Sequence, residues 1–336
     1  MSESQFPASH TPSPEEQDAD ARLELIVSIV VPIFFSLIGL TGFIGNLLVI
    51  ITVIFNQQMR NTTNLLIFNL SFADLLFICF CIPFTGVDYS LSWWPFGEFW
   101  CKTVQFLIFC TAYISIYTLV LMSLDRYLAV CFPVSRVRNE RNTIISIFAL
   151  WFIVLLTNLP VFHAHGINEY VYNDRNLTSC TFLDDNELIS WSTFHVSFFT
   201  SSYLMPLLFI SILYFLMLLR LWKSNLTQSS ESKRGKRRVT RLVLVIVACF
   251  AILWLPIQSI LLLKSLKMYE ATTHLTIALQ ISAHILAYAS SCINPLLYAF
   301  LSENFRKSFR KIIYCHPSSN SRYFPTATKF TATTGT

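Results

Sequence analysis

The stretch that decides the fold is Cys101–Tyr127, CKTVQFLIFCTAYISIYTLVLMSLDRY, which has no charged residue between Lys102 and Asp125. As a helix with a rise of about 1.5 Å per residue, the segment from Cys101 to Arg126 is about 37 Å long. The hydrocarbon core of a bilayer is about 30 Å thick. One helix can therefore hold a thiol at one side of a membrane and an arginine at the other. One face of it, at alternating steps of four and three, carries Cys101, Gln105, Ile108, Ala112, Ser115, Leu119, Met122 and Arg126.

The composition of the whole chain indicates a membrane protein. Its 336 residues are 54% hydrophobic and 13% charged, whereas soluble domains average about 25% charged. We predict an all-α membrane protein, a bundle of seven transmembrane helices within a domain at 25–300. The seven apolar stretches are each about long enough to cross a bilayer, and they centre on 25–55, 64–86, 101–130, 143–165, 191–222, 239–264 and 272–300.

The chain ends differ from this core in composition. Residues 1–24 are acidic, rich in Pro and Ser and without an apolar run, so we predict a disordered tail and no signal peptide. Near the other end, Phe305, Phe309, Ile312 and Ile313 recur at helical spacing opposite basic residues. This pattern predicts a short amphipathic helix at 301–315 on an anionic inner leaflet, with Cys315 as a palmitoylation site. A disordered cytoplasmic tail is expected at 316–336.

The charges predict the orientation of the chain in the plasma membrane. If the N-terminus is extracellular, the outer segments hold five of the 24 Lys and Arg residues and the inner segments hold 19. The same arrangement places 14 of the 19 acidic residues outside. Basic residues gather on the cytoplasmic side of membrane proteins, which favours an extracellular N-terminus. An acidic outer surface also favours a cationic ligand.

Modification sites follow from this orientation. Of nine cysteines, only Cys101 and Cys180 fall at the oxidising outer side, which predicts a disulfide between the second outer loop and the third span. Among the N-x-S/T sequons only Asn176 is extracellular, so it is the expected glycosylation site.

Segments 169–172 and 179–182 are expected to pair as a hairpin around Cys180.

Polar groups inside the spans are candidate functional residues. Asp74 is a carboxylate at mid-membrane, which is costly and by default functional. The alternative is a neutral Asp74 that is hydrogen-bonded to Asn46 and Asn294. Kinks are expected in the last three spans, because proline removes a backbone hydrogen bond from a helix; these prolines are Pro206, Pro256 and Pro295.

An ordered set of residues, one group per span, resembles the rhodopsin-like G-protein-coupled receptors. The set is Asn46, Leu70–Asp74, Cys101 with Cys180, Asp125–Tyr127, Trp151, Pro206, Trp254 with Pro256, and Asn294–Pro295 with Tyr298. Further stretches look similar to the allatostatin-A and galanin receptors, most of all to the invertebrate allatostatin-A branch. These stretches are Trp94–Gly97, Trp100–Lys102, Val104–Gln105, Tyr117–Val130 and Arg138–Thr143.

This resemblance implies a receptor and no enzyme. The implied ligand is a short, C-terminally amidated neuropeptide, and the implied partners are an inhibitory-type heterotrimeric G protein, arrestin and a receptor kinase, with no nucleic acid. Ile108 stands where amine receptors place an Asp, and Tyr288 where opsins place a retinal lysine. The alternatives are a galanin-like or other neuropeptide receptor, a seven-helix transporter, for which no internal repeat is visible, and a membrane enzyme, for which the sequence places no set of Asp, Glu or Cys residues beside His163 and His165.

The resemblance also suggests three sites. The ligand amide is expected to meet Gln105, Gln258 and His284, although each aromatic in the wall could be bundle packing and Asp88 a surface charge. The full predicted ligand wall is Phe84, Asp88, Trp94, Gln105, Ile108, Phe109, Phe182, His195, Gln258, Leu261, Lys264, His284 and Tyr288.

The second site is a sodium and activation site, with Na⁺ as an allosteric ion and no other metal or cofactor. Its residues are Asn46, Asp74, Ser115, Trp254, Ser291, Asn294 and Tyr298. The third is an inner switch formed by Asp125, Arg126, Tyr127 and Tyr214, in which Arg126 pairs with Asp125 at rest. The sixth span lacks the acid that many relatives offer to this arginine, so Thr240 is expected to give a weaker hydrogen bond and basal activity to be raised.

Overall fold

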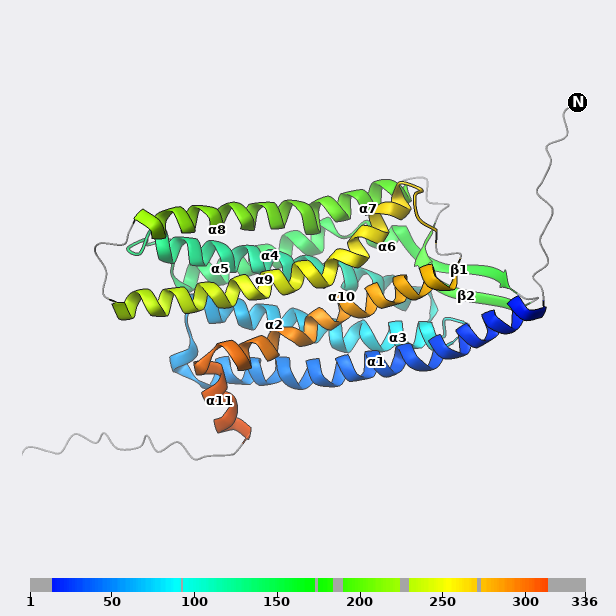
Figure 1. Cartoon of the computed structure of the whole chain (residues 1–336), viewed down its shortest axis with the longest axis horizontal. Helices are drawn as coiled ribbons and strands as arrows, with labels where there is room; N and C mark the ends of the chain where they lie inside the picture. Colours follow the sequence, from blue (N-terminus) through cyan, green and yellow to red (C-terminus); the bar gives the residue numbers. More distant parts are fainter. Residues whose placement is uncertain are drawn as a thin grey trace, which may run out of the picture.

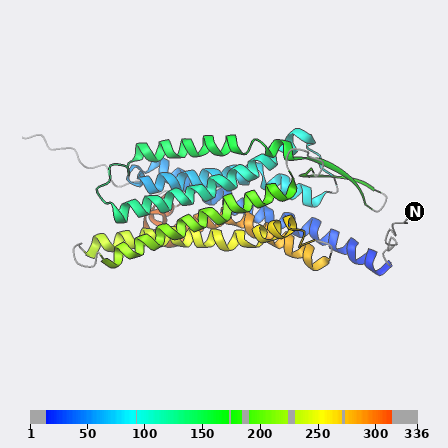
Figure 2. The ribbon, with the colours of Figure 1, turned by 90° about the horizontal axis from the view of Figure 1, so that it is seen from above.

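The computed structural model describes residues 14–91, 93–172, 175–183, 190–223, 230–270 and 273–313. Long helices lie side by side along one axis (Figure 1). A two-stranded hairpin stands at one end of the bundle, where α1 also begins, and α11 crosses the other end; a view turned by 90° shows the same lengthwise packing (Figure 2). We call these the hairpin end and the α11 end.

Seven helical segments are long and apolar enough to cross a membrane, which confirms the predicted fold class. Large apolar side chains such as Phe148, Phe152 and Phe215 are exposed on their outer surfaces, as lipid-facing residues are. The helices are α1 (Pro14–Phe55), η1 (Gln57–Met59), α2 (Thr62–Phe80), α3 (Ile82–Ser90), α4 (Gly97–Cys131), α5 (Glu140–Thr157), α6 (Val161–Ala164), α7 (Trp191–Phe199), η2 (Thr200–Leu204), α8 (Met205–Lys223), α9 (Ser230–Ser265), α10 (His274–Leu301) and α11 (Glu303–Ile313).

Proline interrupts two of the spans. The second span is divided at Cys81 into α2 and α3, with Pro83 in the first turn of α3. In the fifth span, η2 is a single π-helical turn before Pro206, and the N–H of Met205 bonds to the carbonyl of Thr200, five residues back. Such turns arise where a proline cannot donate to the regular helical ladder. Pro256 and Pro295 lie inside continuous helices.

The N-terminal boundary differs from the prediction. Helix α1 begins at Pro14, so residues 14–24 of the predicted tail are helical, while residues 1–13 lie outside the described part of the chain. Acidic residues are favourable at a helix N-terminus because of the helix dipole, and Asp18 pairs with Arg22 one turn later at 2.7 Å. Composition alone predicts disorder here, because it does not register where acidic residues lie relative to a helix start or which charges are one turn apart.

The predicted amphipathic helix is present as α11, with Phe305 and Phe309 buried against the bundle. It begins at Glu303 and not at residue 301, because Leu301 still belongs to α10. Cys315 and the predicted tail at 316–336 lie outside the described residues.

The hairpin is longer than predicted and has another register. Strands β1 (His165–Tyr172) and β2 (Arg175–Phe182) are antiparallel. Ile167 pairs with Cys180, Glu169 with Thr178 and Phe182 with His165. Residues 169–172 pair with 175–178, and residues 179–182 pair with 165–168, so the two predicted segments do not pair with each other.

Close helix contacts hold the core together. A Cβ atom at Gly45 would lie 2.8 Å from Cβ of Pro295, so α1 packs on α10 with no space for a side chain at this position. Asn69 joins three helices, since it donates to Thr118 of α4 and accepts from the indole N–H of Trp151 of α5, both at 2.8 Å. These contacts align the cavity and the switch described below along α4.

Candidate functional site

The first turns of α4, at the hairpin end of the bundle, are tied to the hairpin. Cys101 and Cys180 form the predicted disulfide. Beside it Trp94 is buried, and its backbone N–H donates to the Thr178 hydroxyl at 2.9 Å. The loop before α4 is thus bound to β2, and β2 forms one wall of a cavity beneath it.

This cavity, of about 330 Å³, lies among α3, α4, the hairpin, α7, α9 and α10. Ile108 is part of its wall, so the position at which amine receptors place a carboxylate is apolar here. Eleven of the thirteen predicted ligand residues line it, namely Asp88, Trp94, Gln105, Ile108, Phe109, Phe182, His195, Leu261, Lys264, His284 and Tyr288. Asp88 is therefore a cavity residue and not only a surface charge.

Phe84 and Gln258 do not line the cavity. The break at Cys81 turns α3 so that Phe84 packs on Phe96 and Trp100, with ring centroids 4.9 and 5.1 Å apart. Gln258 is 1% exposed and donates from Nε2 to the Ser202 hydroxyl at 3.2 Å. The face of α9 that lines the cavity therefore differs from the predicted one. Its residues are Trp254, Ile257, Leu261 and Lys264.

Several cavity residues were missed by the sequence analysis. Gln280 lies one turn before His284 on α10, so extending the predicted His284–Tyr288 face would have found it. Tyr89 follows the predicted Asp88. The other missed wall residues lack such a signal, and they include Thr85, His165, Trp191 and Phe198.

One end of the cavity is aromatic. We define the aromatic end as Phe109, His165, Phe182, Trp191, His195 and Phe198. Two of its ring pairs pack edge to face, with centroids 5.2 Å apart for Phe182–Trp191 and 4.9 Å for Phe109–Phe198. Burial and the nearby His195 lower the pKa of His165 to about 4, so this imidazole is neutral at physiological pH. The aromatic end suits a large apolar side chain.

A second part of the cavity wall, formed by α3 and α10, is polar. We define the polar wall as Thr85 and Tyr89 of α3 and Gln280, His284 and Tyr288 of α10. The Tyr89 hydroxyl lies 2.8 Å from Nδ1 of His284, and the hydroxyls of Thr85 and Tyr288 are 3.4 Å apart. Apart from the single charges of Asp88 and Lys264, the groups lining the cavity are neutral or apolar.

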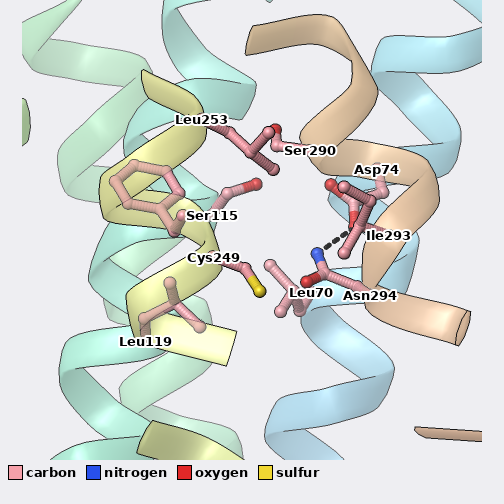
Figure 3. A pocket seen from close by; sticks show the side chains of 10 residues that line it. Leu70, Asp74, Ser115, Leu119, Cys249, Leu253, Ser290, Ile293 and Asn294 are labelled. Carbon is pink, nitrogen blue, oxygen red and sulfur yellow. Dashed lines mark hydrogen bonds between the residues drawn. The ribbon is translucent and has the colours of Figure 1, made fainter. Parts of the chain in front are cut away.

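Below this cavity, Asp74 is buried between α2 and α10. Its Oδ2 accepts from Nδ2 of Asn294 at 2.9 Å (Figure 3). Asn46 donates instead to the carbonyls of Gly42 and Ser291, both at 2.9 Å. Of the two hydrogen bonds predicted for a neutral Asp74, the structure thus shows the one from Asn294 and not the one from Asn46.

Two small cavities adjoin Asp74, with volumes of about 10 and 20 Å³. Ser115 lines both, and its side chain lies across the first from Asp74 in Figure 3. A water-sized species needs about 10–15 Å³. Trp254 donates to Ser290 at 3.1 Å, while Tyr298 is fully buried and its hydroxyl has no partner among the described residues. Oxygen ligands around a buried carboxylate fit a small hard cation such as Na⁺.

Near the last turns of α4, at the opposite end from the disulfide, Arg126 is folded onto Asp125, as predicted. The carboxylate of Asp125 also accepts from the hydroxyls of Thr62 and Thr63, each at 2.8 Å, and from Arg138 at 2.8 Å. Arg126 donates to the Thr63 hydroxyl as well.

The described residues of α9 give Arg126 no hydrogen bond. The expected contact from Thr240 is not formed; its carbonyl instead accepts from Tyr214 at 3.5 Å. Tyr127 packs on Phe132 with ring centroids 5.9 Å apart. The lock on the arginine thus lies between α4 and α2, and the sequence analysis missed it because Thr62, Thr63 and Arg138 are ordinary loop-proximal residues in the sequence.

A seven-helix bundle with a disulfide-tied hairpin, a cavity at one end and a buried pair of arginine and aspartate at the other defines a membrane receptor. Residues 45–298 match the family of seven-transmembrane receptors of the rhodopsin type. The chain is 52% identical to an allatostatin-A receptor of Bombyx mori over 317 residues, 93% of this chain and 87% of that protein.

Galanin receptors are similar as well. The galanin-like G-protein-coupled receptor npr-9 of Caenorhabditis elegans is 35% identical over 88% of this chain and 76% of its own length. Galanin receptor type 2 of Rattus norvegicus is 38% identical over 85% and 76%. The chain belongs to the rhodopsin family of seven-transmembrane receptors, a family of plasma-membrane receptors and not of enzymes.

Proposed function

We propose that the protein is an allatostatin-A-type receptor: a short, C-terminally amidated neuropeptide enters the cavity from outside, and an inhibitory-type G protein binds at the α11 end. The observation that carries this proposal is the division of the cavity into an aromatic end and a mostly neutral polar wall. An amidated peptide with Phe and Leu side chains matches both parts. The 52% identity to an allatostatin-A receptor supports the same ligand class.

The proposal places the N-terminus outside the cell. This orientation is supported by the excess of basic residues at the α11 end, and it puts the Cys101–Cys180 disulfide in an oxidising compartment. In the same orientation Asn176 is exposed to the glycosylation machinery; its side chain lies outside the described residues.

The proposal includes sodium as an allosteric ion at Asp74. A cation that binds the resting bundle preferentially shifts the population away from the active state. Support comes from the buried carboxylate and the adjoining small cavities. At the inner end, release of Arg126 from Asp125 and Thr63 would open a surface for the G protein, and later for arrestin and a receptor kinase, while α11 would rest on anionic lipid.

A ligand screen tests the proposal. The receptor is expressed with a promiscuous G protein and exposed to Phe-Gly-Leu-amide peptides, to galanin-type peptides and to unrelated amidated peptides, with calcium as the signal. We expect the Phe-Gly-Leu-amide peptides to be the most potent. A response to galanin-type peptides alone would assign the chain to the alternative branch, and silence towards all peptides would contradict the proposal.

A further inference from the structure

We infer that Gln280, with the Tyr89–His284 pair, forms the subsite that distinguishes a C-terminal amide from a free carboxylate. The inference rests on the proposed peptide function and assigns the specificity of the same cavity to named residues. Gln280 lines the cavity, and its Oε1 is buried with no hydrogen-bond partner in the described part of the chain. A buried amide oxygen is costly to leave without a donor, and because Gln280 lines the cavity, the N–H of a bound ligand can supply that donor.

The neighbouring imidazole supplies the complementary group. Gln280 and His284 are four residues apart on α10 and thus share one face. Nδ1 of His284 lies 2.8 Å from the Tyr89 hydroxyl. When the phenol donates to Nδ1, the imidazole proton resides on Nε2, which then offers an N–H to the cavity.

The wall therefore presents one acceptor and one donor, the pattern that a primary amide satisfies with its own N–H and C=O. A carboxylate has no donor for Oε1 of Gln280, and it would carry a charge into a largely apolar cavity. The positively charged Lys264 lines this cavity, and Asp88 lines the same cavity with the opposite charge. Tyr288 and Thr85 contact each other and need no ligand group.

A second buried glutamine provides a matched control. Oε1 of Gln258 is also buried without a partner, but Gln258 does not line the cavity. Gln280→Met removes both amide atoms of the wall residue, Gln280→Glu keeps acceptor oxygens, and Gln258→Met makes the same change outside the cavity. Tyr89→Phe removes the donor to His284 and leaves its ring in place.

The test compares a short peptide ending in Phe-Gly-Leu-amide with the same peptide ending in a free carboxylate. Potency of each is measured by calcium signal at matched surface expression, and the acid-to-amide ratio of half-maximal concentrations is the readout. We expect Gln280→Met to lower this ratio about tenfold, the scale of one lost hydrogen bond to a buried group. Gln280→Glu and Gln258→Met should keep the ratio, and Tyr89→Phe should lower it.

The outcomes separate this inference from the proposed function. An unchanged ratio in Gln280→Met, including the case in which both peptides lose potency equally, would overturn the inference. The receptor assignment would still stand. If Gln280→Met fails to reach the surface, Gln280→Glu and Tyr89→Phe decide the test. A lowered ratio in Gln280→Glu, or an unchanged ratio in Tyr89→Phe, would overturn the inference. A wild-type receptor that responds to neither peptide contradicts the proposed function itself.

Discussion

Replacing Thr63 by valine should raise the ligand-free activity of the receptor. In the resting arrangement the Thr63 hydroxyl donates to Asp125 at 2.8 Å and accepts from Arg126. Valine has the same shape and neither hydrogen bond. A hydrogen bond to a buried charged group contributes about 1.5–3 kcal/mol, and Arg126 needs this acceptor only while it is folded onto Asp125.

The expected rise in ligand-free activity follows from the lower of these two energies. A loss of about 1.5 kcal/mol from the resting state alone shifts the ratio of resting to active receptor about tenfold. An active population of about 1% without ligand would rise to about 10%. Thr62→Val is the control, because Thr62 donates to Asp125 at 2.8 Å but forms no hydrogen bond with Arg126.

The assay is G-protein activation without ligand, measured at equal surface expression of wild type, Thr63→Val and Thr62→Val. We expect the order Thr63→Val, then Thr62→Val, then wild type. Basal activity of Thr63→Val at or below that of Thr62→Val would refute a lock built between α4 and α2.

Three further predictions concern other parts of the bundle. In Asp74→Asn, sodium should no longer lower agonist affinity in a binding assay; a sodium effect equal to that of wild type would remove Asp74 from the ion site. Gly45→Ala places a Cβ 2.8 Å from Pro295 and should reduce surface expression, whereas Gly39→Ala, with its nearest atom at 3.9 Å, should not; equal expression would contradict the packing argument. His165 has a folded-state pKa of about 4 against 6.5 for the free group, so the unfolded chain binds its proton more readily and stability should fall as pH drops from about 6.5 towards 4. His165→Gln should lose part of that slope in thermal unfolding; an identical slope would show that other groups carry it.

The long axis of the fold could be predicted from the sequence because a membrane imposes a simple length rule. The stretch from Cys101 to Arg126, which is uncharged between Lys102 and Asp125, is continuous in α4, with the disulfide at one end and the arginine at the other. Cysteine placement alone identified Cys180 as the partner. These features depend on length and compartment, which the sequence carries directly.

Side-chain direction was less predictable, because it depends on where helices break and rotate. Phe84 was wrongly placed in the cavity since the break at Cys81 could not be seen from Pro83 alone. Gln258 and Gln280 both lie towards the hairpin end of the bundle, yet of the two only Gln280 lines the cavity. The contacts of Asp125 with Thr62 and Thr63 depend on how α2 and α4 pack, for which helical periodicity gives no signal.

Direct binding of an amidated peptide tests the central claim most closely. A labelled peptide ending in Phe-Gly-Leu-amide is added to membranes that contain the receptor, and unlabelled amide, free-acid and galanin-type peptides compete with it. The proposed ligand class requires saturable binding that the amide displaces and the other two displace weakly. Absence of saturable binding, or displacement by a galanin-type peptide at lower concentration than by the amide, would contradict it.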